Sequence, residues 1–130
     1  MAVREQHQVV KEFNAAADLS AKQYYFVELG SGTVNVTDAI TDVPVGVLQN
    51  KPDAAGKHAE VAMFGFTKVV AGGAISAGAL IGCTTAGKAV ALTIGTDTTT
   101  YVLGRALTAA TADGQVISAT VDCMAPTRAA

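Results

Sequence analysis

After residue 18, apolar and polar residues alternate along much of the chain with a period of two. This period is typical of β-strands that bury one face and expose the other. The clearest cases are 33-TVNV-36 and 58-HAEVAMF-64. On this pattern we predict nine short strands, at residues 24–29, 33–36, 44–49, 58–64, 66–70, 79–83, 88–93, 100–107 and 115–121.

Clusters of Gly, Asn, Asp and Pro separate these segments and predict turns. They lie at residues 30–32, 50–57, 71–74, 95–98 and 112–114. Many short strands joined by turns indicate an all-β domain, either a small barrel or a sandwich.

The chain contains a degenerate internal repeat. Residues 19–36 align with residues 75–92, and residues 46–56 align with residues 104–114. Three pairs of glycines match between the copies: Gly32 with Gly87, Gly46 with Gly104, and Gly56 with Gly114. We expect these glycines to form turns and, within strands, bends or close backbone approaches. The repeat favours two similar β-modules that close one pseudo-symmetric barrel, which would leave no open sheet edge.

The first 18 residues differ from the rest, since they carry both charge signs and few apolar residues. The spacing of Val9 and Phe13 fits one turn of a helix, and an extended arm fits the sequence as well. We therefore predict an N-terminal arm at residues 1–18, a β-barrel domain at residues 19–124 and a C-terminal tail at residues 125–130.

Composition and charge limit the classes of function. The 130 residues suffice for one domain, and charged residues are only 15% of them, which suggests that neighbouring chains cover part of the surface. The net charge of −2 and the scattered basic residues argue against nucleic-acid binding. The polar start does not resemble a signal peptide, and no apolar run is long enough to span a membrane. We expect a protein that is made in the cytosol and binds neither nucleic acid nor membrane.

One stretch, 82-GCTTAGKA-89, matches the phosphate-binding pattern G-x-x-x-x-G-K-[ST] at all but its last position. Ala89 cannot hold a magnesium ion, and the residues that follow have strand character, so the helix that a phosphate loop needs is missing. The aligned copy has the turn 30-GSGT-33, with Thr33 in place of Lys88. We predict a hairpin turn in which Lys88 is a solvated charge.

Other candidate chemistry is sparse. His58 and Glu60 share one face of a strand, which an exposed pair explains at least as well as a general base. Asp38 and Asp42 could bind a cation, although oxygen-ligand loops usually carry more acids. Cys83 and Cys123 form no C-x-x-C motif, and we expect reduced, partly buried thiols. We predict no catalytic residues, no cofactor and no metal, and thus no enzyme.

Residues 43–90 and 101–121 carry an ordered series of motifs: a GV strand, an Ala-Gly turn, a V-x-V-like strand, I-x-A-G and a G-K-x-V turn. In this series the chain resembles the small capsid decoration, or cement, proteins of tailed bacteriophages, in a group often mislabelled as RecA/RadA-like recombinases. The resemblance implies a β-barrel or β-tulip-like domain that binds the outside of a mature capsid as a homotrimer. It implies the major capsid protein and sister copies as partners, and a place on the virion surface after assembly in the host cytoplasm.

By analogy with decoration proteins, the arm would contact the capsid through Val3, Arg4, His7, Val9, Val10 and Phe13. Two alternatives stay open at this stage. The group label and the near-match to a phosphate loop suggest a nucleotide-binding recombination factor. A module displayed on the virion for adhesion to the host surface is the other, although the shortage of aromatic residues counts against stacking on sugars.

Overall fold

The computed structural model describes residues 8–130, which form strands, turns and loops. The strands are β1 (Gln8–Ala15), β2 (Phe26–Leu29), β3 (Thr33–Val36), β4 (Gly46–Leu48), β5 (His58–Val70), β6 (Leu80–Cys83), β7 (Ala89–Ala91), β8 (Tyr101–Val102), β9 (Gly104–Ala106), β10 (Val116–Asp122) and β11 (Thr127–Arg128). The prediction of an all-β fold is confirmed. In this described part, no helix exists that is long and apolar enough to cross a membrane.

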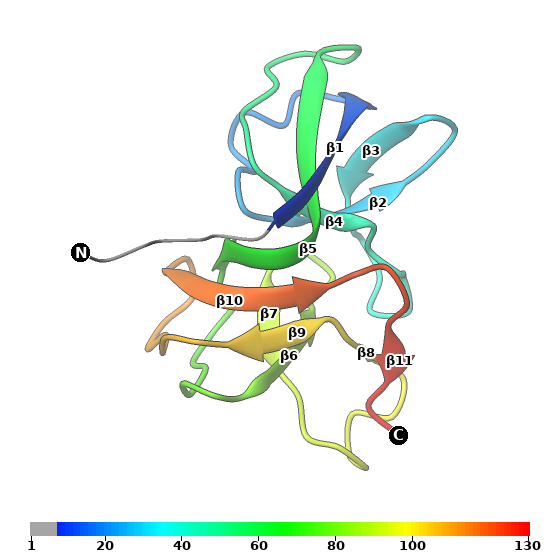
Figure 1. Cartoon of the computed structure of the whole chain (residues 1–130). Coiled ribbons are helices and arrows are strands. Elements are labelled where there is room, and N and C mark those ends of the chain that lie inside the picture. Colours follow the sequence, from blue (N-terminus) through cyan, green and yellow to red (C-terminus); the bar gives the residue numbers. More distant parts are fainter. Residues whose placement is uncertain (1–7) are drawn as a thin grey trace, which may run out of the picture.

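Nine strands form one sheet in the order β1-β3-β2-β4-β5-β10-β9-β6-β7, and β8 pairs with β11 in a small second sheet. Because β1 also pairs with β5, the first five strands close on themselves. The long strand β5 runs from the upper into the lower half of the molecule (Figure 1). It includes Gly65, whose φ is 112°, so the two strands predicted at residues 58–64 and 66–70 are one bent strand.

The sequence repeat corresponds to a repeat of strand pairings. In the first half β2 pairs with β3 and β4, and β4 pairs with the start of β5. In the second half β6 pairs with β7 and β9, and β9 pairs with β10. Gly46 lies opposite Val27 just as Gly104 lies opposite Ile81. We call residues 8–63 module 1 and residues 64–122 module 2, so that β5 contributes its first half to one and its second half to the other.

Strand β1 is the module 1 counterpart of the second half of β5. Ala15 pairs in parallel with Val34, and Ala71 forms the corresponding parallel bridge to Ala89. Residues 8–15, which the sequence assigns to an arm, thus adopt the extended alternative and lie within the sheet (Figure 1). The domain boundaries expected after residues 18 and 124 stay predictions.

The two modules have matching cores. The buried cluster of module 1 consists of Ala15, Leu19, Val27, Val34, Leu48, Ala59 and Val61. Each of these has a buried counterpart in the larger cluster: Ala71, Ile75, Ile81, Ala89, Ala106, Ile117 and Ala119. Side-chain volume differs between the modules at most of these positions, so the correspondence lies in which positions are buried and not in which residues fill them.

The modules pack against each other through a continuous core. Phe26 and Val47 of module 1 are fully buried and belong to the larger cluster, most of which comes from module 2. The Phe26 amide donates a hydrogen bond to the Gly87 carbonyl at 2.8 Å. A buried hydrogen bond of 2.8 Å also joins the Thr37 hydroxyl and the Cys83 thiol. The long strand β5 and this contact make the two modules one folded unit.

Gly46 and Gly104 occupy equivalent positions at the start of β4 and β9, where a neighbouring backbone comes close. A Cβ atom at Gly46 would overlap the Ala62 carbonyl, and one at Gly104 would overlap the Thr120 carbonyl. Only glycine fits such an approach. The other four glycines that the sequence singles out have a positive φ: Gly32, Gly56, Gly87 and Gly114.

Candidate functional site

The near-match to a phosphate loop is a hairpin turn between β6 and β7, as predicted. Cys83 lies opposite Ala89, and the Thr84 amide donates to the Lys88 carbonyl at 2.8 Å. A strand follows the lysine, so the turn lacks the helix N-terminus that binds phosphate in a nucleotide-binding loop.

The prediction for Lys88 missed an ion pair. Its Nζ atom lies 2.9 Å from the Asp113 Oδ1 atom, and its side chain is only 22% exposed. The hydrogen bond to Asp113 raises the pKa of Lys88 above its ordinary value. The sequence could not show this pair, because the turn that carries Asp113 approaches the hairpin only in the folded chain.

Both cysteines are free, as predicted, and both are buried rather than partly buried. Burial raises the pKa of the Cys83 thiol to about 12 and that of the Cys123 thiol to about 12. Since the thiolate is the reactive form, neither side chain is poised to act as a nucleophile at neutral pH.

Three carboxyl groups meet beside the β2–β3 hairpin, from Glu28, Asp38 and Asp42. Asp42 accepts hydrogen bonds from the amides of Asp38 at 3.2 Å and Ala39 at 3.0 Å. Burial, followed by the hydrogen bond and the charge of Asp42, raises the pKa of Glu28 to about 7. The hydrogen bond from Glu28 in turn lowers the pKa of Asp42. A proton held between Glu28 and Asp42 therefore relieves the repulsion between these carboxylates.

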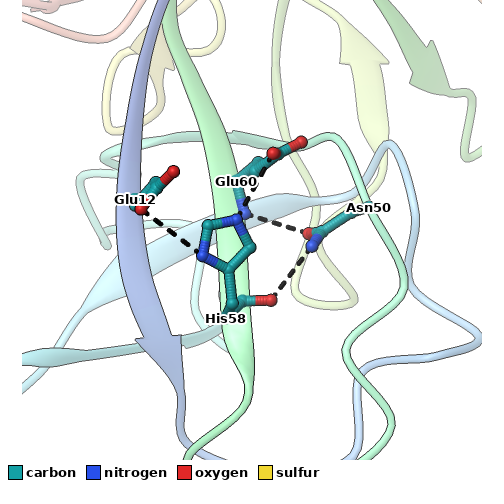
Figure 2. Close-up of polar contacts among 4 residues, drawn as sticks. All are labelled: Glu12, Asn50, His58 and Glu60. Carbon is teal, nitrogen blue, oxygen red and sulfur yellow. Dashed lines mark hydrogen bonds and ion pairs between the residues drawn. The ribbon is translucent and has the colours of Figure 1, made fainter.

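A second polar cluster joins β1 to β5. Figure 2 shows the His58 imidazole between the carboxylates of Glu12 and Glu60. Its Nδ1 atom lies 3.5 Å from Glu12 Oε2, and its Nε2 atom lies 3.3 Å from Glu60 Oε1. The exposed His58–Glu60 pair was predicted. Glu12 was missed, because it lies on a strand that only the fold brings alongside.

Asn50 holds the backbone of this cluster from the neighbouring loop (Figure 2). Its side-chain amide donates to the His58 carbonyl at 3.0 Å and accepts from the Glu60 amide at 2.9 Å. These two bonds take the place of hydrogen bonds to a neighbouring strand at the start of β5. The backbone that carries His58 and Glu60 is therefore held in place.

Large apolar side chains are exposed where β1 crosses the middle of β5. We call Val9, Val10, Phe64 and Phe66 the central apolar surface; they are 51%, 44%, 44% and 45% exposed. A bulge between Val9 and Val10 places them opposite Phe64 and Ala62, two residues apart on β5 and therefore on one face. The two phenylalanines also line an open hollow of about 330 Å³ over Gly104 and Thr120.

The structure separates the residues predicted to form a contact arm. Val3, Arg4 and His7 lie outside the described residues. Val9 and Val10 lie on the central apolar surface, whereas Phe13 is partly buried against the core of module 1. Phe64 and Phe66 were missed, although their spacing in 64-FGF-66 places both on one face of a strand. Nothing in the sequence distinguishes that face from a buried one, since Ala62 on the same face is fully buried.

A family model described as phage cement protein matches residues 3–122. The chain belongs to the phage cement protein family. The resemblance drawn from the sequence is thereby confirmed, and the role that follows is structural: a decoration component of the virion that binds the phage capsid.

One solved structure supports the fold. The chain is similar to the head fiber gp8.5 N base of bacteriophage phi29, with a TM-score of 0.64 and 22% sequence identity. The similarity covers 90% of this chain and 96% of that chain. The search of curated proteins gave no match.

Proposed function

We propose that this chain decorates the outer surface of the mature phage head and strengthens it by binding the major capsid protein. The family match over nearly the whole described chain carries this proposal. The two modules share a continuous core, which supports a rigid clamp rather than a flexible tether.

The central apolar surface is the proposed capsid contact. Contiguous exposed patches of large apolar side chains often mark sites of interaction with other proteins. Here the patch lies on β5, which is paired on both sides, with β1 and with β10, so its side chains start from an ordered backbone. Val9, Val10 and Phe13 remain in the contact set from the sequence, with Phe13 supporting the strand from its inner side. The contact set proposed from the sequence also includes Val3, Arg4 and His7, which precede β1 along the chain.

We propose further that copies associate as homotrimers after release into the host cytoplasm and then join the expanded head. Many copies with modest contacts would hold the shell firmly through avidity. The low content of charged residues supports contacts between copies. Sedimentation velocity of the purified chain tests this part: we expect a trimer, and a monomer at every concentration would contradict it.

We propose no catalytic activity. The lysine of the apparent phosphate loop is paired with Asp113, and both thiols are buried with raised pKa values. A calorimetric titration with ATP should therefore show no binding. Saturable binding that Lys88→Ala abolishes would instead favour a nucleotide-binding recombination factor.

Co-sedimentation with expanded phage heads that lack the protein tests the proposed contact. The wild-type chain should sediment with the heads, and the double variant Val9→Ser, Phe64→Ser should lose most of this binding. Ile94→Ser is the matched control, because Ile94 is an equally exposed apolar residue, at 55%, in the loop after β7. Equal binding of all three proteins would reject the central apolar surface, and no binding by the wild-type chain would reject capsid decoration itself.

A further inference from the structure

The cluster around His58 has an arrangement that a β-sheet normally avoids. Glu12 and Glu60 are directly opposite each other in the antiparallel pair of β1 and β5. Like charges at directly opposed positions destabilise a sheet. His58 lies two residues before Glu60 on β5 and contacts both carboxylates. Two acids and one imidazole thus lie together on one face of the sheet.

The repeat provides an internal comparison for this cluster. The counterparts of Glu12 and Glu60 in module 2 are Lys68 and Ser118. These two residues lie opposite each other, as the two glutamates do in module 1. The counterpart of His58 is Val116, which pairs with Val70 as His58 pairs with Asn14. Module 2 thus builds the same strand pairing without opposed charges, and the fold does not require the acids of module 1.

We propose that Glu12, His58 and Glu60 form a binding site for a divalent transition-metal ion of the Zn²⁺ class. Each offers one ligand atom, and these atoms all lie within 4.8 Å of one another. One imidazole nitrogen with two carboxylate oxygens is a donor set that zinc accepts, with water completing a four-coordinate site. Magnesium and calcium prefer oxygen ligands alone, so the imidazole selects against them.

Charge and orientation both support the site. Two carboxylates supply the charge that a divalent cation neutralises, and the ion replaces their mutual repulsion by attraction. The imidazole would bind the ion in its neutral form through one ring nitrogen, and the glutamate that now lies beside the other nitrogen would turn its carboxylate to the same side of the ring. Asn50 fixes the backbone of both β5 ligands, so only side-chain torsions need to change.

The ion would connect β1 to β5, and these are the strands whose pairing closes module 1. Because metal binds the folded arrangement and not the unfolded chain, it should raise the thermal stability of the protein. The site lies on the same pair of strands as the central apolar surface, but its metal affinity does not depend on whether that surface binds a capsid.

Calorimetric titration of the purified chain with Zn²⁺ at neutral pH tests the proposal, and Mg²⁺ serves as the comparison ion. We expect one saturable zinc site, no magnesium binding, and a zinc-dependent shift of the His58 ring resonances in NMR spectra. Glu12→Gln, His58→Gln and Glu60→Gln should each weaken zinc binding at least about tenfold. Asp53→Asn, which removes an exposed carboxylate in the loop before β5, should leave it unchanged.

The variants alter exposed side chains, and circular dichroism should show that each keeps the β-fold of the wild-type chain. Absence of saturable zinc binding below about 1 mM would overturn the proposal. Zinc binding that survives all three substitutions would overturn it as well. So would His58 ring resonances that do not shift on addition of zinc, since the imidazole would then not be a ligand.

Discussion

The two modules share their strand pairings, but side chains at corresponding positions of the two modules have different surroundings. In module 1, Phe26 and Val47 lie opposite each other and are buried in the shared core. In module 2, the corresponding pair is Leu80, which is partly exposed, and Arg105, which is exposed. A repeated backbone therefore does not impose a repeated surface. Module 1 uses these two positions to pack against its neighbour, whereas in module 2 the corresponding side chains are partly or fully exposed.

Other differences follow the same division. Buried positions correspond between the modules, as do the glycines required by close backbone contacts, whereas exposed positions have changed freely. The acids around His58 and the carboxyl cluster around Glu28 occur in module 1 alone among the described residues, and Lys88 pairs with Asp113 within module 2. What the modules keep in common is the fold, and what separates them is the surface chemistry on which binding depends.

Truncation of the packed aromatic residue should give the largest difference between the modules. Phe26→Ala should cost about 4 kcal/mol of unfolding free energy, because it opens a cavity where the two modules meet. Leu80→Ala, at the corresponding position, should cost only about 1 kcal/mol, since its side chain is already partly exposed. Urea unfolding of both variants measures this difference. Equal losses would show that the two faces are not used differently.

Adding a methyl group at the paired strand glycines should show where the modules are alike. Gly104→Ala and Gly46→Ala should each cost about 3 kcal/mol, because the new Cβ atom would overlap a neighbouring carbonyl. Gly73→Ala is the control, since a Cβ atom there meets no atom within 4 Å. Thermal unfolding checks the order, and a tolerated alanine at either strand glycine would contradict the equivalence of the two positions.

The carboxyl cluster of module 1 should make stability depend on pH. The pKa of Glu28 is about 7 in the folded protein, against an ordinary value of 4.5, so the folded state holds its proton more tightly than the unfolded state. The resulting stabilisation is fully present below pH 4.5 and is lost as the pH rises through about 7. Glu28→Gln should flatten the stability profile between these pH values, and Asp53→Asn should not. An unchanged profile in Glu28→Gln would rule out Glu28 as its source.

The ion pair of module 2 should have the smallest effect. Lys88→Ala should lower the unfolding free energy only slightly, because Asp113 is 63% exposed and solvent screens the pair. Asp113→Ala should have a similar effect, and the double variant should lose no more than the two single variants combined. A much larger loss would mean that the β6–β7 hairpin depends on this contact.

The local features of the fold could be predicted from the sequence. Alternating residues located most of the strands, and the glycines of 30-GSG-32 and of residues 82–87 marked two hairpins that the structure contains. These predictions succeeded because period-two alternation and turn chemistry act over a few neighbouring residues. The matched glycines also revealed the repeat, since they occupy positions where a close backbone approach or a positive φ disfavours other residues.

The repeat alignment itself was partly wrong. It placed Tyr24 beside Leu80, whereas the structure makes Phe26 the counterpart of Leu80. Tyr24 corresponds instead to Gly78: their amides donate to the equivalent carbonyls of Leu48 and Ala106, both at 2.7 Å. Tyr24 has a φ of 69° and Gly78 a φ of 87°, so a tyrosine occupies a conformation that the other module gives to glycine. Sequence identity could not reveal a conformation shared by such different residues.

Contacts between segments that are distant along the chain could not be predicted from the sequence either. Glu12 meets His58 only because β1 pairs with β5, and Asp113 meets Lys88 only because a turn folds back on the hairpin. Neither partner is marked by a local motif. The central apolar surface escaped notice for the same reason, because the exposure of Phe64 and Phe66 depends on which faces of the sheet the modules cover.

The most direct test of the capsid contact is a cryo-electron microscopy reconstruction of expanded heads saturated with this protein. We predict density on the outer surface in which Val9, Val10, Phe64 and Phe66 face the major capsid protein, while the loop that carries Ile94 points away. Density in which the β6–β7 hairpin faces the shell and the central apolar surface is free in solvent would contradict the account.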